Sequence, residues 1–331
     1  MPETGSAQGA LPLRSAYPAR DLTHSKGRRA ISPDKTTGSF RRRFVPEPGV
    51  LNGKGKTRPF ACARSSFLAV RARKAPSPRP DTGFLHAVLA GPDGTFPAIR
   101  DRYRSVRSGL SRFKDGGGYK ANRQALEALV QKACRWDAKA GKPVFLIQEA
   151  RPSFCSSACY LLLLKALETW DSGRSGPVIS ERAWLALMPR IGQHDGDGPW
   201  GWANANGPGF AVLVHSLGAG VNFEDWGQAR PGDFMKIFWT DHIGRRESGH
   251  LTVLVKDGGD EVTFWSSNVP DGYGARTVPK SKIKRVIFTR ITRPERFNLA
   301  PSIGHHAWLA SLLKQDVSMK EVRRHCGMKE P

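Results

Sequence analysis

The chain has 331 residues, with 52 lysines and arginines against 29 aspartates and glutamates and a net charge of +23. This length suffices for one large domain or two small ones with a real hydrophobic core. The excess charge alone would favour a nucleic-acid partner, but about +14 of it lies in residues 1–107. The charge therefore characterises mainly one end of the chain.

The five cysteines are few for this length, and they form neither a CxxC pair nor a Cys/His cluster with zinc-finger spacing. A disulfide scaffold and a structural zinc site are therefore not expected. No apolar run reaches the roughly 18 residues of a transmembrane helix. The N-terminus also lacks a charged segment followed by an uninterrupted apolar one, so we expect no membrane span and read no secretion signal. The cysteines are Cys62, Cys134, Cys155, Cys159 and Cys326.

Composition divides the chain into four parts. Residues 1–82 are rich in Pro, Gly, Ser, Arg and Lys without sustained periodicity, which predicts a disordered basic tail. A mis-assigned start or a targeting segment would have the same composition. Residues 83–118 are transitional and end in the breaker "KDGGGY". We expect the folded domain over 119–293, and one or two peripheral amphipathic helices over 294–331.

The first half of the expected domain has helical patterns. Apolar residues recur at helical spacing after Tyr119, and Gly141 closes this helix. Ser180 is the expected N-cap of a later helix that ends at Pro189. The expected segments are a helix at 119–141, an extended run at 143–150, helices at 154–170 and 180–189, a Gly- and Trp-rich loop at 192–209, and a helix at 210–220.

The second half has strand patterns. Apolar or alternating runs are bounded by turn residues, and "KDGGDE" between two of them predicts a hairpin turn. Helices followed by antiparallel strands are typical of the α+β class in one segregated domain. The expected strands are 233–239, 250–255, 261–267 and 284–291.

The stretch "RPSFCSSACYLLLL" is the first candidate for chemistry. Pro152 favours a helix start and Ser153 can cap it, which would place Cys155 in the first helical turn. Unpaired amides there favour a thiolate and can bind an oxyanion. Cys159 lies one turn further in and is expected to be packed and inert. The alternative is that both cysteines are only core residues.

A thiolate also needs a general base, and His250 stands apart among nine histidines because it opens a strand after Gly249. In a hairpin turned on "GG", position 267 lies opposite His250. One residue of uncertainty in the turn leaves Ser266, Ser267 and Asn268 open as the residue that orients the imidazole. Asn268 is the natural choice, since its carbonyl can accept from an imidazole N–H.

Cys-Ser at a helix start, "RPGDFMKIFW", "GHLTVLV" and "FWSSN" together resemble the NlpC-type and CHAP-type cysteine hydrolases. The resemblance implies a papain-like domain with N-terminal helices packed on a small antiparallel sheet. It implies Cys155 as nucleophile, His250 as base, Asn268 as third member and residues 231–233 as a structural turn. Phe154 departs from the family, which usually has Asp, Asn or Gln before the cysteine. The separation of 95 residues between Cys155 and His250 is also long.

The resemblance further implies cleavage of an amide or peptide bond in peptidoglycan through a thioester, with no metal or cofactor, and a place in the cell envelope or outside the cell. Trp200, Trp202 and Asn204 are the expected substrate-binding wall, unless the tryptophans fold inward. Two alternatives remain open: an inactive wall-binding domain of the same fold, or a nucleic-acid-binding protein that acts through residues 1–82. The tail lacks a base-reading motif, so no specific nucleic acid is expected. The sequence gives no oligomeric state.

Overall fold

The structure is a computed structural model that describes Leu110 and residues 113–330. The predicted tail at 1–82 lies outside the described residues, as does most of the transitional segment at 83–118.

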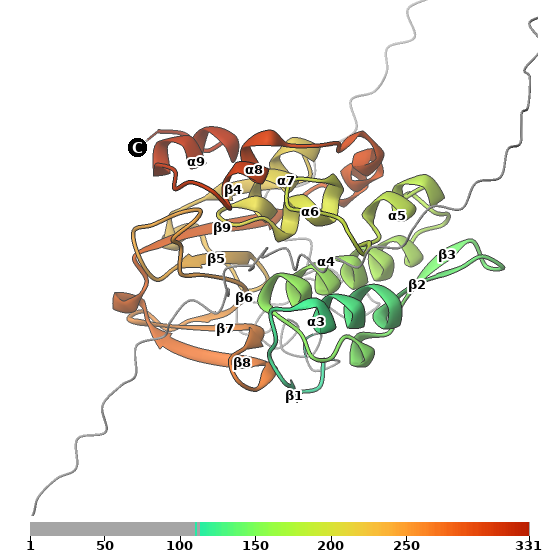
Figure 1. The fold of residues 1–331 in the computed structure, drawn as a ribbon, viewed down its shortest axis with the longest axis horizontal. Helices are drawn as coiled ribbons and strands as arrows, with labels where there is room; N and C mark the ends of the chain where they lie inside the picture. Colours follow the sequence, from blue (N-terminus) through green and yellow to red (C-terminus); the bar gives the residue numbers. More distant parts are fainter. Residues whose placement is uncertain (1–109, 111–112, 331) are drawn as a thin grey trace, which may run out of the picture. The chain divides into compact units, whose positions relative to one another are not determined.

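The centre of the described part is a seven-stranded sheet in which every pair of neighbours is antiparallel (Figure 1). In sheet order the strands are β1 (Gly116–Gly117), β8 (Gly272–Pro279), β7 (Glu261–Asn268), β6 (Gly249–Asp257), β5 (Phe234–Phe238), β9 (Arg285–Ile291) and β4 (Gly220–Phe223). The four predicted strands are confirmed, and three further strands of the sheet were missed: the short β1 and β4 and the eight-residue β8.

Helices pack on one face of this sheet (Figure 1). The long helix α4 (Cys155–Ser172) lies against β6 and β7, and α7 (Gly209–Leu217) lies against β4 and β9. The result is a mixture of helices and antiparallel sheet, as expected for the α+β class. The remaining α-helices are α3 (Arg123–Glu127), α5 (Glu181–Leu187), α6 (Gly198–Asn204), α8 (Ala307–Ser311) and α9 (Met319–His325).

The helix expected over 119–141 is wrong in its second half. After α3 and a π-helical turn over Ala128–Ala133, the chain forms a hairpin of β2 (Cys134–Asp137) and β3 (Lys142–Phe145). The Asp137 carboxylate accepts the backbone N–H groups of Lys139 and Ala140 in the turn, at 3.0 Å each. This local turn competes with helix continuation, and the helical spacing of apolar residues could not reveal it.

Two other expectations need correction. The stretch 192–209, expected as a loop, contains α6. The extended run at 143–150 is a strand only to Phe145 and then becomes a 3₁₀ turn over Ile147–Glu149. Short 3₁₀ segments also occur at Trp226–Gln228, Lys280–Lys282 and Pro294–Ser302.

Both faces of the sheet contribute to a core. Phe234 and Phe238 of β5 pack in the large cluster with the helices, whereas Met235 and Ile237 between them belong to a second, smaller cluster. This alternation follows from the two-residue period of a strand.

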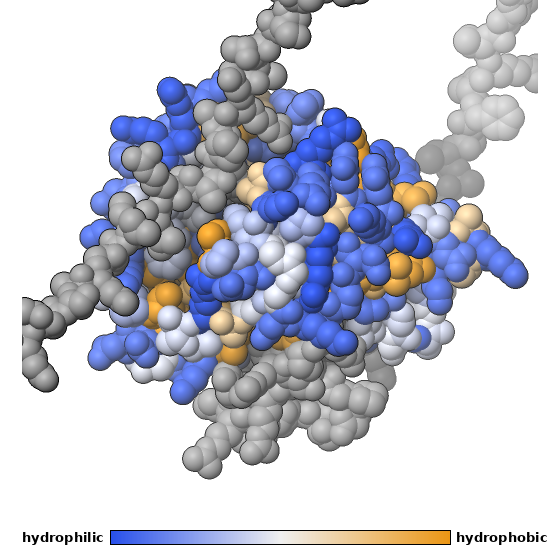
Figure 2. Space-filling model, turned by 60° about the horizontal axis from the view of Figure 1, so that its bottom comes forward, coloured by the Kyte–Doolittle hydropathy of each residue, from blue (hydrophilic) through white to orange (hydrophobic). Residues whose placement is uncertain are grey.

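The side of the molecule brought forward in Figure 2 is largely hydrophilic, with scattered hydrophobic residues.

The C-terminal segment is helical, as predicted, but it is not peripheral. Phe297, Leu309 and Val322 are each 0 % exposed and belong to the same large cluster as α4. The apolar residues of 294–330 therefore complete the main core.

Candidate active site

Helix α4 begins at Cys155 because the chain before it is extended. Phe154 has φ −137° and ψ 169°, and the Ser157 hydroxyl accepts its backbone N–H at 2.9 Å. The expected cap, Ser153, instead donates its hydroxyl to Ser267 at 2.8 Å, so it ties the helix start to β7. Cys155 occupies the first helical position, where backbone N–H groups have no partner within the helix.

Cys155 is 5 % exposed and lines a small cavity. Burial raises the pKa of its thiol, but a hydrogen bond with His250 and the charge of His250 lower it. The backbone N–H of Leu251 and the charge of Lys236 lower it further. The balance places the pKa at about 7, below the ordinary value of 9. A thiol with this pKa is substantially ionised at neutral pH.

The other described cysteines differ from Cys155. Cys159 is 0 % exposed, its Sγ donates to the carbonyl of Leu251 at 3.3 Å, and burial raises its pKa well above 9. Burial also raises the pKa of Cys134 to about 12 and raises that of Cys326. Cys62 lies outside the described residues.

His250, the second residue of β6, lies beside Cys155 and also beside Asn268, the last residue of β7. The distance from His250 Nε2 to Asn268 Oδ1 is 3.1 Å. The paired residues Val253 and Trp265 fix the register, and the same register carried to the start of β6 places Asn268 level with His250. Asp257 pairs with Val262, so the turn is centred one residue later than "GG" and shifts the register by two residues. The strand irregularity between Leu254 and Lys256 reverses one of them, which leaves the one residue by which the sequence-based register differs.

The two other residues that the sequence left open have different partners. Ser267 accepts the hydroxyl of Ser153 at 2.8 Å. Ser266 donates to the carbonyl of Leu251 at 2.7 Å. Both serines are 0 % exposed. Their hydroxyls connect β7 to the chain just before α4 and to β6, rather than to the imidazole.

The orientation of the Asn268 amide follows from its surroundings. Its Nδ2 donates to the carbonyls of Ser266 at 3.3 Å and Gly274 at 2.8 Å, so Oδ1 faces His250. A carbonyl oxygen can only accept, so Nε2 carries the proton and donates it to Asn268. The other ring nitrogen, Nδ1, is therefore the one that can take a proton from Cys155.

Tyr119 is a further residue of the site that sequence reasoning missed. Burial and then the charge of Cys155 raise the pKa of its phenol, which hydrogen-bonds with the Cys155 side chain. A phenol that stays protonated acts as the donor in this bond. Tyr119 reaches the site because it forms a bridge with Ser153 and its N–H donates to the carbonyl of Pro270 at 3.0 Å. These contacts join distant segments, and no local pattern indicates them.

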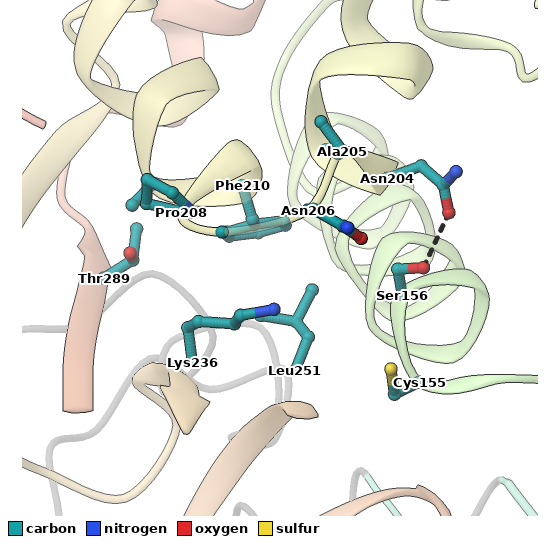
Figure 3. A pocket seen from close by; sticks show the side chains of 13 residues that line it. Cys155, Ser156, Asn204, Ala205, Asn206, Pro208, Phe210, Lys236, Leu251 and Thr289 are labelled. Atoms are coloured by element: carbon teal, nitrogen blue, oxygen red, sulfur yellow. Dashed lines mark hydrogen bonds between the residues drawn. The ribbon is translucent and has the colours of Figure 1, made fainter. Parts of the chain in front are cut away.

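The cavity beside Cys155 lies between α4, the connection from α6 to α7, and the strands β5 and β6 (Figure 3). It offers about 20 Å³ to the centre of a water molecule, which is room for one such molecule. Its lining consists of Cys155, Ser156, Ala203, Asn204, Ala205, Asn206, Gly207, Pro208, Phe210, Ala211, Lys236, Leu251 and Thr289.

Of the expected substrate-binding residues, only Asn204 lines this cavity. Its amide accepts from Ser156 at 2.7 Å and donates to Asp195 at 2.9 Å, so it anchors the cavity wall to the first turn of α4 (Figure 3). Trp200 and Trp202 are 1 % and 7 % exposed and belong to the main core. The expectation that they form a cleft wall is therefore corrected: the indoles fold inward, because this burial removes large apolar surfaces from water.

The remaining described histidines lie elsewhere or have other partners. His242 and His305 pair with Asp316 and Asp197 at 3.3 and 2.6 Å, and His194 and His215 are exposed. His306 and His325 pack against Trp308. Within the described residues, no group of three or more His, Cys, Asp and Glu side chains could hold a metal ion.

Searches against family models, curated proteins and solved structures find no match for this chain. The likeness to the NlpC-type and CHAP-type hydrolases therefore stays a prediction from the motifs. Across residues 113–330, no helix has the length and apolar character needed to cross a membrane.

Proposed function

We propose that the protein is a cysteine hydrolase that cleaves an amide or peptide bond with Cys155 as nucleophile, His250 as general base and acid, and Asn268 as the residue that orients His250. The main evidence for this proposal is the arrangement of these three side chains. Cys155 lies at the N-terminus of α4 with a pKa of about 7 and a hydrogen bond to His250, whose Nε2 lies 3.1 Å from Asn268 Oδ1. A nucleophile, a base and an orienting group in this order are the requirement for covalent acyl transfer.

In the first half of the reaction, the proton of Cys155 passes to Nδ1 of His250 and the thiolate attacks the carbonyl carbon of the substrate. The C–N bond then breaks, and the imidazolium gives its proton to the leaving amine. A thioester on Cys155 remains. Throughout, Nε2–H stays donated to Asn268, which holds the ring in one orientation.

In the second half, His250 takes a proton from water, whose oxygen attacks the thioester carbonyl. The C–S bond breaks, the acid product leaves and the thiolate returns. During both halves an oxyanion forms next to Cys155. The backbone N–H at the helix start and the Tyr119 hydroxyl are the donors that this geometry offers.

The papain-like fold and the substrate class are parts of the same proposal. Helices packed on an antiparallel sheet, with the cysteine on the first long helix and the base at a strand start, support this fold. By the resemblance of the motifs, the substrate is peptidoglycan, either its stem peptide or the bond between stem and sugar. An excess of basic residues would favour an anionic wall polymer.

The test combines thiol mapping with an activity assay. Iodoacetamide near neutral pH is expected to alkylate Cys155 in preference to Cys159, because only Cys155 is ionised there. Cys155→Ala is expected to lower digestion of purified peptidoglycan at least about 1000-fold, since no nucleophile remains.

Cys159→Ala is the matched control and retains digestion. Preferential alkylation of Cys159, or equal digestion by Cys155→Ala, overturns the enzyme proposal. Selective alkylation of Cys155 without release of peptidoglycan fragments by wild type overturns the substrate class alone.

A further inference from the structure

Lys236 is the charged side chain in the cavity lining beside Cys155. It lies on β5, level with Leu251 of β6, and its side chain is 13 % exposed. Removing a lysine from water is unfavourable unless the ammonium is paired. Its partners therefore indicate what keeps it at this position.

Glu247 is the partner, and it lies outside the cavity lining. Lys236 Nζ donates to Glu247 Oε1 at 2.7 Å, and the carboxylate is 3 % exposed. The other oxygen, Oε2, accepts the backbone N–H groups of Gly207 at 2.6 Å and Gly244 at 3.0 Å. Backbone N–H groups thus hold the second carboxylate oxygen, whereas the ammonium, with three donors, borders the cavity.

Gly249, directly before the general base, makes room for this ion pair. A Cβ atom at position 249 would lie 2.8 Å from both Lys236 Nζ and Glu247 Oε1. Contacts this short would displace the ion pair. The glycine of the "GH" motif therefore allows the Lys236–Glu247 pair to lie close to the start of the strand that carries His250.

We infer that Lys236 forms an anion subsite that binds a carboxylate of the substrate next to the scissile amide. The inference rests on the proposed function and names its substrate class: amides with a free carboxylate one or two bonds from the carbonyl that Cys155 attacks. The cavity beside Cys155 has room for about one water-sized group, so it can receive a carboxylate oxygen but no larger part of the substrate. Asn204 and Asn206 line the cavity opposite Lys236 (Figure 3). The lining contains no negatively charged side chain that would repel a carboxylate.

A purely structural ion pair would need no ligand, and the two roles differ in a measurable way. Iodoacetate and iodoacetamide alkylate a thiolate by the same step: sulfur bonds to the methylene carbon and iodide leaves. Only iodoacetate carries a carboxylate one bond from the reacting carbon. Their rate ratio at Cys155, relative to the ratio for a free cysteine peptide, therefore reports an anion subsite.

We expect this relative ratio to favour iodoacetate about fivefold or more in the full-length wild type, since a partly buried cation attracts an anion more strongly than one in water does. His250, when protonated, also attracts anions, so the deciding comparison is with a variant. Lys236→Met alone would remove the ammonium that compensates the buried Glu247 carboxylate. The double variant Lys236→Met/Glu247→Gln removes both charges and is the one to measure.

In the double variant the preference for iodoacetate is expected to fall to near that of the free peptide, while iodoacetamide still modifies Cys155. Lys256→Met, which removes an exposed lysine at the far end of β6, is the matched control and keeps the wild-type ratio. An unchanged ratio in the double variant, or no preference in wild type, overturns the subsite while leaving the proposed function intact. If neither reagent selects Cys155, the proposed function fails, and the subsite with it.

Discussion

The first and second turns of α4 present two cysteines in nearly equal burial and opposite chemical states. Cys155 is 5 % exposed and Cys159 0 %, yet the pKa of the first is lowered to about 7 and that of the second is raised well above 9. Burial acts on both thiols in the same direction. The difference comes from their partners: His250, a backbone N–H and Lys236 for Cys155, a carbonyl acceptor for Cys159.

One turn of helix, about 5.4 Å, therefore separates a reactive thiol from a packed one. A donor stabilises the charged sulfur, whereas a carbonyl that accepts the S–H proton stabilises the neutral one. Low exposure alone therefore does not identify an inert cysteine. The contacts of Cys155 with its partners are the ones whose removal should change its reactivity.

The largest expected effect follows from removing the imidazole. His250→Ala removes the hydrogen bond and the charge that most strongly lower the pKa of Cys155, so this pKa should rise from about 7 toward or above 9. A group with a lowered pKa is charged above that value and loses its charge as the pH falls through it. At pH 7 the thiolate fraction should therefore fall about 50-fold. The pH dependence of iodoacetamide alkylation at Cys155 measures this directly, and an unshifted midpoint would contradict the assigned pair.

A smaller effect is expected from Asn268→Ala, which removes the acceptor of the imidazole Nε2–H and leaves Nδ1 chemically intact. Loss of one such hydrogen bond corresponds to about 1.4 kcal/mol, or about a tenfold decrease in turnover. Ser267→Ala is the matched control on the same strand, since its hydroxyl contacts Ser153 and not the imidazole. Equal losses in turnover for the two variants would show that Asn268 has only a structural role.

The predictable parts of this structure are those that local patterns determine. Alternation and turn residues located β5, β6, β7 and β9, and the "GG" hairpin located the neighbour of His250 to within one residue. The exact neighbour depended on an irregularity near Val255, which apolar alternation does not reveal.

The missed parts depend on contacts between distant segments. Tyr119 reaches Cys155 through pairing with Ser153 and Pro270, which no spacing rule connects. Trp200 and Trp202 occur in a Gly-rich stretch typical of loops, but both lie in the short helix α6 and pack in the main core. The helix expected through residue 141 ended early because a side chain of the turn satisfied backbone groups.

The smallest effect on the site is expected from Cys159→Ala. The substitution removes one weak hydrogen bond and one sulfur atom from the core, while the Leu251 carbonyl still accepts from Ser266 at 2.7 Å. The free energy of unfolding should therefore fall by only about 1 kcal/mol in a denaturant titration. Cys159 is neutral at its raised pKa, so its removal should leave the alkylation midpoint of Cys155 near pH 7 and change turnover less than about twofold. A shift of that midpoint by a full pH unit would mean that the two thiols titrate together, and the division of α4 into a reactive and a packed turn would be wrong.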